Sequence, residues 1–151
     1  YSKKVKSLSE LKEGDTVAIP NDATNGGRAL DVLATAGLIK LNDVALKTKL
    51  DIVENPKNLK FTELEAAQLP RVIEDFTLAV INTNYALSAG LNPSSDALAL
   101  ESANSPYANI IVVKAGNETS AKTQALIKAV KSDDVKKFIT EKYKGAIVPA
   151  F

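Results

Sequence analysis

Segments with the pattern of buried strands alternate with segments with the pattern of helices along most of this chain. Residues 16–19 and 78–81 are short apolar runs typical of buried strands, and residues 26–36 between them carry apolar side chains at helical spacing. Gly37 follows as a plausible C-cap. Because parallel strands need a crossover connection, usually a helix, this order predicts an α/β domain with a mainly parallel sheet.

The other predicted elements continue the alternation until the last third of the chain. We expect strands at residues 16–19, 51–53, 59–61, 78–81, 97–100 and 109–113, and helices at 26–36, 64–75, 84–89, 120–131 and 133–143. Pro70 lies inside the 64–75 pattern, so a break or a true helix start is expected near Leu69. The two consecutive C-terminal helices interrupt the alternation, which is compatible with a different lobe.

Composition excludes several kinds of chemistry. The 151 residues carry a net charge of +1, so bulk charge does not favour nucleic-acid binding. The absence of His and Cys excludes the common zinc sites, the Ser-His-Asp and Cys-His arrangements and disulfides. No calcium-loop spacing occurs and no apolar run approaches membrane-spanning length. We therefore expect no metal and no cofactor.

The first candidate site is the loop that follows the strand at residues 16–19. It contains Asn25, Gly26, Gly27 and Arg28, the last of which we place in the first turn of the next helix. Glycines let a ligand approach the backbone, a helix start offers unpaired N–H groups, and a guanidinium matches a carboxylate. This combination favours a site for a small carboxylate or phosphate. The alternative is that Asn25 or its neighbour Thr24 caps a helix while Arg28 pairs with a surface acid.

A second candidate site follows the strand at residues 78–81. Asn82 or Asn84 can hydrogen-bond a ligand there, since ligands bind at the carboxyl ends of strands in open α/β sheets. Helix capping is the other common role of such asparagines. Asn109 opens a predicted strand, where Asn is uncommon, so its amide faces either a ligand or a bulge. Tyr85 can cover an apolar ligand or simply belong to the core.

With these motifs in hand, the chain resembles the methionine-binding lipoproteins of bacterial ABC importers. The similarity covers essentially the whole chain, and the segments Asn25-Gly26-Gly27-Arg28 and Pro106-Tyr107-Ala108-Asn109 are the most specific. The matching runs are residues 17–22, 24–30, 36–41, 51–57, 63–71, 79–82, 105–109 and 143–151.

The resemblance implies a type II periplasmic-binding-protein fold, in which two α/β lobes close over one amino acid. By this similarity, residues 1–104 correspond to a nearly complete second lobe, which contacts the ligand. Residues 105–151 correspond to the crossover strand and C-terminal helices of the first lobe, whose N-terminal part and lipobox Cys are absent from these residues.

The resemblance also implies a function and a set of binding residues. Arg28 is similar to the arginine that holds the ligand carboxylate, Asn84 and Asn109 match asparagines that bind the ligand's polar groups, and Asn25 and Tyr85 complete the expected set. The implied protein is not an enzyme. It captures L-methionine, a related amino acid or a methionine dipeptide outside the cytoplasmic membrane, where an N-terminal lipid anchor not present in this chain holds it, and it delivers the ligand to an ABC permease. An enzyme or an effector-binding domain on the same two-lobe fold is the alternative.

Overall fold

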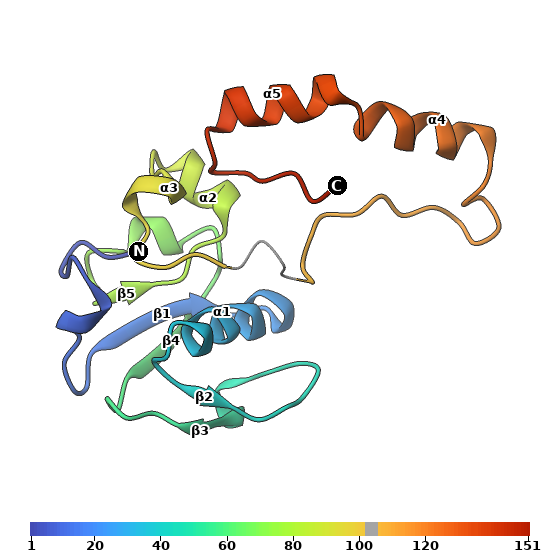
Figure 1. Cartoon of the computed structure of the whole chain (residues 1–151). Helices are drawn as coiled ribbons and strands as arrows, with labels where there is room; N and C mark the ends of the chain where they lie inside the picture. The colour runs from blue at the N-terminus through green and yellow to red at the C-terminus, as the bar shows by residue number, and fades with distance from the viewer. Residues whose placement is uncertain (102–105) are drawn as a thin grey trace. The chain divides into compact units, whose positions relative to one another are not determined.

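The computed structural model describes residues 1–101 and 106–151 (Figure 1). Its contacts divide the chain into two compact units, Tyr1–Leu100 and Glu101–Phe151. We describe each unit by itself, beginning with the first, which contains nearly all of the buried residues.

A three-stranded parallel sheet forms the centre of the first unit. Its strands are β1 (Thr16–Pro20), β4 (Lys60–Leu64) and β5 (Leu78–Ala79), in the order β4-β1-β5. β1 pairs along its whole length with β4, from Thr16 opposite Lys60 to Pro20 opposite Leu64. The prediction of a mainly parallel sheet is therefore confirmed for this unit.

Apolar side chains cover both faces of β1. Val17 and Ile19 lie in a core with Leu30 and Leu33 of α1 (Ala23–Thr35), the helix that runs beside β1 in Figure 1. Ala18 points to the opposite face, into a second cluster. Alternation places successive side chains on opposite faces, so a central strand covered on both sides must be apolar throughout. The second cluster consists of Ala18, Leu69, Ile73, Ala79, Ile81 and Ala86.

Several short elements complete the first unit. An antiparallel pair, β2 (Lys40–Leu41) and β3 (Ile52–Glu54), lies outside the parallel sheet. The remaining helices are η1 (Leu8–Glu10), η2 (Lys49–Asp51), η3 (Leu69–Arg71), α2 (Thr83–Ser88) and α3 (Pro93–Asp96).

Two predicted elements of the first unit are wrong. The helix expected at residues 64–75 does not form as one element, because Leu64 pairs with Pro20 at the end of β4. The break or helix start expected near Leu69 is confirmed, since the single turn η3 begins there with Pro70 in its first positions, where proline is tolerated. The strand expected at residues 97–100 does not form, and α3 just before it was not predicted.

The second unit contains two helices, α4 (Ala121–Val130) and α5 (Asp133–Tyr143), each capped by a serine. Both agree with the predicted ranges. The strand expected at residues 109–113 is wrong, because no strand is formed anywhere in the described residues of this unit. Its apolar side chains are exposed instead, with 78% of Ile110 and 79% of Val112 accessible. A strand needs a neighbour for its backbone groups, and this segment has none among the described residues.

Candidate functional site

The three parallel strands of the first unit end at one edge of the sheet, and both predicted ligand loops begin there. β1 leads through Asn21 and Asp22 into α1, while β5 leads into Asn82 and α2. Main-chain bonds continue past the strand ends: Asn21 N–H donates to the Leu64 carbonyl at 2.9 Å. Ligands of open α/β sheets bind at this carboxyl edge.

α1 begins earlier than the sequence pattern predicts. Its first residue is Ala23 rather than Gly26, and its N-cap is Asp22 rather than Thr24 or Asn25. Asp22 Oδ1 accepts a hydrogen bond from the Asn25 N–H at 2.9 Å. That bond, together with the Asn25 side-chain amide, keeps the pKa of the Asp22 carboxyl below its usual value of 3.8.

At the start of α1, where we predict that open amides bind an anion, one amide, the Asn25 N–H, is already bonded to Asp22. Asp22, a carboxylate of the chain itself, already lies at this helix start. Arg28 consequently lies in the second turn of α1 rather than the first.

Gly26 and Gly27 also have a different role from the predicted one. A Cβ on Gly26 would lie 2.9 Å from the Pro20 carbonyl oxygen, and one on Gly27 would lie 2.9 Å from the Lys47 carbonyl oxygen. Both glycines therefore let α1 approach neighbouring backbone of the same unit. The predicted role of these glycines was to let a ligand approach the backbone. In this structure they serve the packing of α1.

The structure brings the two predicted loops together through their asparagines. Asn82 Nδ2 donates to Asn25 Oδ1 at 2.8 Å, although 57 positions separate the two residues. The other atom of that amide, Asn82 Oδ1, is buried and accepts no hydrogen bond from the residues that the structure describes. A buried acceptor without a donor costs free energy, so this atom is the clearest indication of a ligand contact in the first unit.

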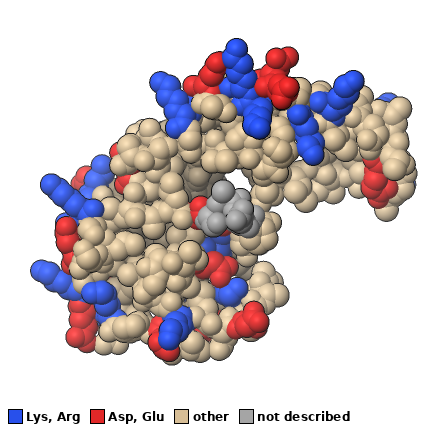
Figure 2. Space-filling model, in the orientation of Figure 1, with Lys and Arg blue, Asp and Glu red and all other residues tan. Residues whose placement is uncertain are grey.

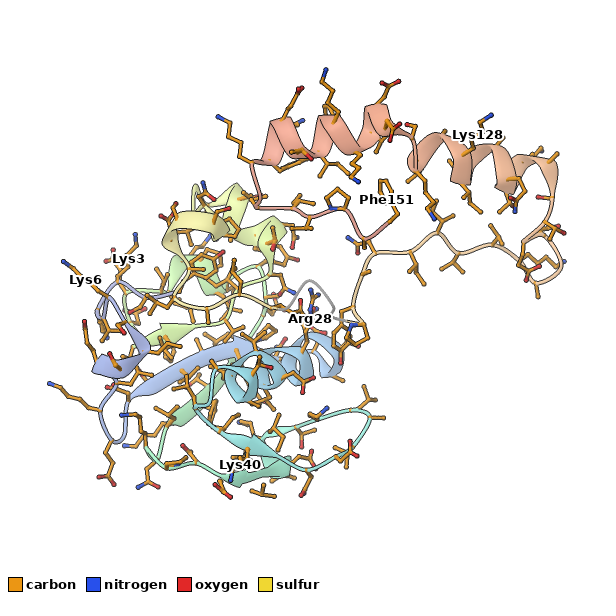
Figure 3. All side chains as sticks on the ribbon, viewed as in Figure 1. Lys3, Lys6, Arg28, Lys40, Lys128 and Phe151 are labelled. Atoms are coloured by element: carbon orange, nitrogen blue, oxygen red, sulfur yellow. The ribbon has the colours of Figure 1, made fainter. Side chains whose placement is uncertain are left out.

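The remaining predicted residues lie at different distances from this pair. Arg28, labelled in Figure 3, is half-buried on α1. It follows Asn25 by three residues, a helical spacing that puts the two side chains on the same face. Tyr85 packs against the second core cluster, whereas the Asn84 side chain is exposed on α2. Asn109 is exposed in the second unit, which we describe separately.

The sequence pattern offers both Asn82 and Asn84 at this edge, and the family resemblance matches Asn84. Asn82 occupies the N-cap position of α2, but its side chain makes no capping hydrogen bond. Its capping role, the common alternative for such an asparagine, is therefore absent at that side chain. The usable signal was its place, directly after the apolar run 78–81 that ends at the binding edge of the sheet.

The charges of the described residues favour neither a metal nor a polyanion. No group of three or more acidic side chains in residues 1–101 and 106–151 is arranged to hold a metal ion. On the face shown in Figure 2, basic and acidic side chains are interspersed. Among the helices of the same described ranges, none is both long enough and apolar enough to cross a membrane.

Comparisons with known proteins agree with this architecture. The chain is 50% identical to the D-methionine-binding lipoprotein MetQ of Salmonella typhi over 152 aligned residues, covering 98% of this chain and 56% of that protein. It is 47% identical to outer membrane lipoprotein 3 of Mannheimia haemolytica, covering 98% of this chain and 57% of that protein. The chain thus spans little more than half the length of these curated relatives.

Solved structures share the fold at high similarity. A nutrient binding protein from Burkholderia cenocepacia, bound to methionine, is 52% identical with a TM-score of 0.91, covering 100% of this chain and 65% of that one. A periplasmic substrate-binding protein of an ABC transporter from Coxiella burnetii is 44% identical with the same TM-score, covering 99% and 64%. The predicted α/β, periplasmic-binding-protein class is confirmed for the part of the fold that this chain represents.

The model of one protein family matches the whole chain. It is described as NlpA lipoprotein and aligns with residues 1–151. Together with relatives that are about half identical over nearly all of this chain, the match leaves one assignment. The chain belongs to the NlpA lipoprotein family.

Proposed function

We propose that the full-length protein captures methionine, or a closely related amino acid or methionine dipeptide, and delivers it to an ABC importer. The observation that carries the proposal is the Asn82–Asn25 hydrogen bond, which joins two loops at the carboxyl edge of the sheet and leaves Asn82 Oδ1 without a donor. An amino acid supplies such a donor through its ammonium group. It also supplies a carboxylate that a guanidinium such as Arg28 recognises.

Two relatives support methionine as the ligand. One is named a D-methionine-binding lipoprotein, and another was solved with methionine bound. In the proposed site Arg28 holds the carboxylate, Asn82 accepts from the ammonium group, and Asn25 and Tyr85 line the same edge. Asn84 and Asn109 remain proposed contacts from the family resemblance alone. Such a site binds its ligand and performs no chemistry on it.

We further propose that residues 1–104 form one lobe and that residues 105–151 belong to a second lobe, completed by a polypeptide segment corresponding to the unmatched part of the relatives. Exposed apolar side chains in the second unit support this, including Ile110, Val112 and Phe138. A folded domain normally buries such a set. The completing segment would supply the neighbours that residues 109–113 need to form a strand.

The family resemblance also indicates where the protein acts. Its relatives carry the name lipoprotein, which supports an extracytoplasmic protein that a lipid anchors to the membrane. The near-neutral net charge of +1 does not favour nucleic acid as an alternative partner.

A thermal-shift screen of the twenty amino acids on the full-length protein tests the function. A ligand that binds only the native state raises the melting temperature by mass action. We expect methionine to give the largest increase. A screen in which methionine gives no increase, or in which another amino acid gives a larger one, would contradict the proposal.

Replacing Arg28 tests the proposed carboxylate contact. We expect Arg28→Ala to weaken methionine binding by about 1.5–3 kcal/mol, because a charge-assisted hydrogen bond is lost. Calorimetry on the full-length protein measures the change. Arg71→Ala is the matched control, since Arg71 is the other arginine of the sequence and is exposed on η3. Equal affinities of Arg28→Ala and Arg71→Ala for methionine would remove Arg28 from the site.

A further inference from the structure

Asp22 makes an unusually complete set of contacts with one neighbour. The Asn25 side-chain nitrogen lies 3.1 Å from Asp22 Oδ1 and 3.0 Å from Oδ2, and the Asn25 N–H donates to Oδ1 as well. An ionised carboxylate only accepts hydrogen bonds. The Asn25 amide must therefore turn its NH₂ group toward Asp22 and its carbonyl oxygen away from it.

The orientation of the Asn25 amide determines the orientation of the Asn82 amide. Asn25 Oδ1 is an acceptor, so the neighbouring Asn82 amide must offer it NH₂, as the 2.8 Å bond from Asn82 Nδ2 shows. The group that Asn82 has left is its carbonyl oxygen, the buried Oδ1 that lacks a donor in the described residues. If Asp22 were not a carboxylate, the Asn25 and Asn82 amides could both turn over. They would still be joined by a hydrogen bond, with donor and acceptor exchanged.

We propose that Asp22 is a positioning residue which, through Asn25, holds Asn82 with its carbonyl oxygen as the free group, so that the site selects ligands carrying an N–H donor. The proposal rests on the proposed function and refines it: the donor is the ammonium group of an amino acid. Because Asn82 Oδ1 is buried, surrounding side chains must move to admit the ligand. A bound ammonium then supplies the missing donor.

Asp22→Asn in the full-length protein tests whether Asp22 sets the orientation of the Asn82 amide. Its Oδ1 can still cap α1, but its NH₂ group lets Asn25 turn over, and Asn82 can then present NH₂ to the ligand. The probes are methionine and its 2-oxo analogue, 4-(methylthio)-2-oxobutanoate, which offers an acceptor where methionine has a donor. We expect the ratio of the methionine affinity to the analogue affinity to fall roughly tenfold. General loss of structure would lower both affinities and leave the ratio unchanged.

Asn82→Asp in the Asp22→Asn background provides a rescue. A carboxylate at position 82 is an acceptor in either orientation of Asn25, so the preference for methionine should return. Asp51→Asn is the matched control: like Asp22, Asp51 accepts from the backbone N–H of a residue three positions away, Thr48, whose hydroxyl it also accepts from, and it belongs to the capping box of η2. We expect that control to keep the wild-type ratio.

Side-chain NMR gives a second readout that needs no ligand. Hydrogen exchange of the Asn82 NH₂ group should be faster in Asp22→Asn than in wild type, because its bond to Asn25 is no longer enforced. An unchanged affinity ratio and unchanged exchange, in a protein that still binds methionine, would overturn the positioning role and leave the proposed function standing. A wild-type protein that binds no methionine would overturn both.

Discussion

Gly26 lies in α1 with its Cα facing the carbonyl oxygen of Pro20, the last residue of β1. A methyl group there would sit 2.9 Å from that oxygen, and the obstacle is backbone rather than a flexible side chain. Contacts this short force the helix or the strand to shift. The residue therefore fixes how closely α1 follows the end of β1, and with it the position of Asn25.

Gly26→Ala should destabilise the protein. Alanine favours a helix over glycine by about 1 kcal/mol, but we expect the clash to outweigh this and to lower the free energy of unfolding by about 1–2 kcal/mol net. Urea denaturation measures the change. A gain of about 1 kcal/mol, as for a helical glycine with open space around it, would show that the contact with Pro20 is not limiting.

The residues of the proposed site were predictable from the sequence only in part. Asn25 and Arg28 were identified from residue type and from their place after a strand, and the structure puts both on the first turns of α1. The choice of Asn82 over Asn84 depends on a contact with Asn25, and no local pattern encodes a contact across 57 positions.

At the scale of elements, the start of α1 depends on Asp22. Asp22→Ala should lower the free energy of unfolding by about 1 kcal/mol through loss of the N-cap. The pKa of this carboxyl is lowered in the folded state, so its contribution is complete above the usual value of 3.8 and disappears as the pH falls through the folded value.

Acid denaturation checks this assignment. The stability difference between wild type and Asp22→Ala should shrink as the pH is lowered below 4. A difference that stays constant down to pH 2 would mean that the ionised carboxylate does not hold this helix start.

Residues before η1 also contact β5: the Ala79 N–H donates to the Tyr1 carbonyl at 2.9 Å.

Helices and strands with a strong local sequence pattern were predictable. Segments whose structure depends on pairing with a distant strand were not. β1, α1, α4 and α5 have strong local patterns and form close to the expected ranges. Residues 64–75 have a helical pattern, yet Leu64 of β4 pairs with Pro20 of β1 and only η3 is helical. The pairing energy of a parallel neighbour is not visible in a local window.

At the scale of the whole molecule, the two units differ in how much they bury. Every buried apolar residue among the described ones lies in the first unit, and Thr123 is the buried residue of the second. Hydrophobic burial is the main source of folding stability. The 151-residue chain should therefore be stable in its first unit and weakly protected in its second.

Hydrogen exchange followed by mass spectrometry tests this difference. In the 151-residue chain, β1 and α1 should exchange slowly, whereas α4 and α5 should exchange near the rate of an open chain. Equal protection of the two units would contradict the burial argument.

The strand predicted at residues 109–113 does not form, and its apolar side chains are exposed. The sequence has the residue types of a strand, but a strand also needs a neighbouring strand to pair with.

A structure of the full-length protein with methionine bound tests the central claim most directly. We predict the ligand at the carboxyl edge of β1 and β5, with its carboxylate within about 3 Å of the Arg28 guanidinium and its ammonium within about 3 Å of Asn82 Oδ1. Methionine bound away from both side chains, or bound with its ammonium facing Arg28, would contradict it.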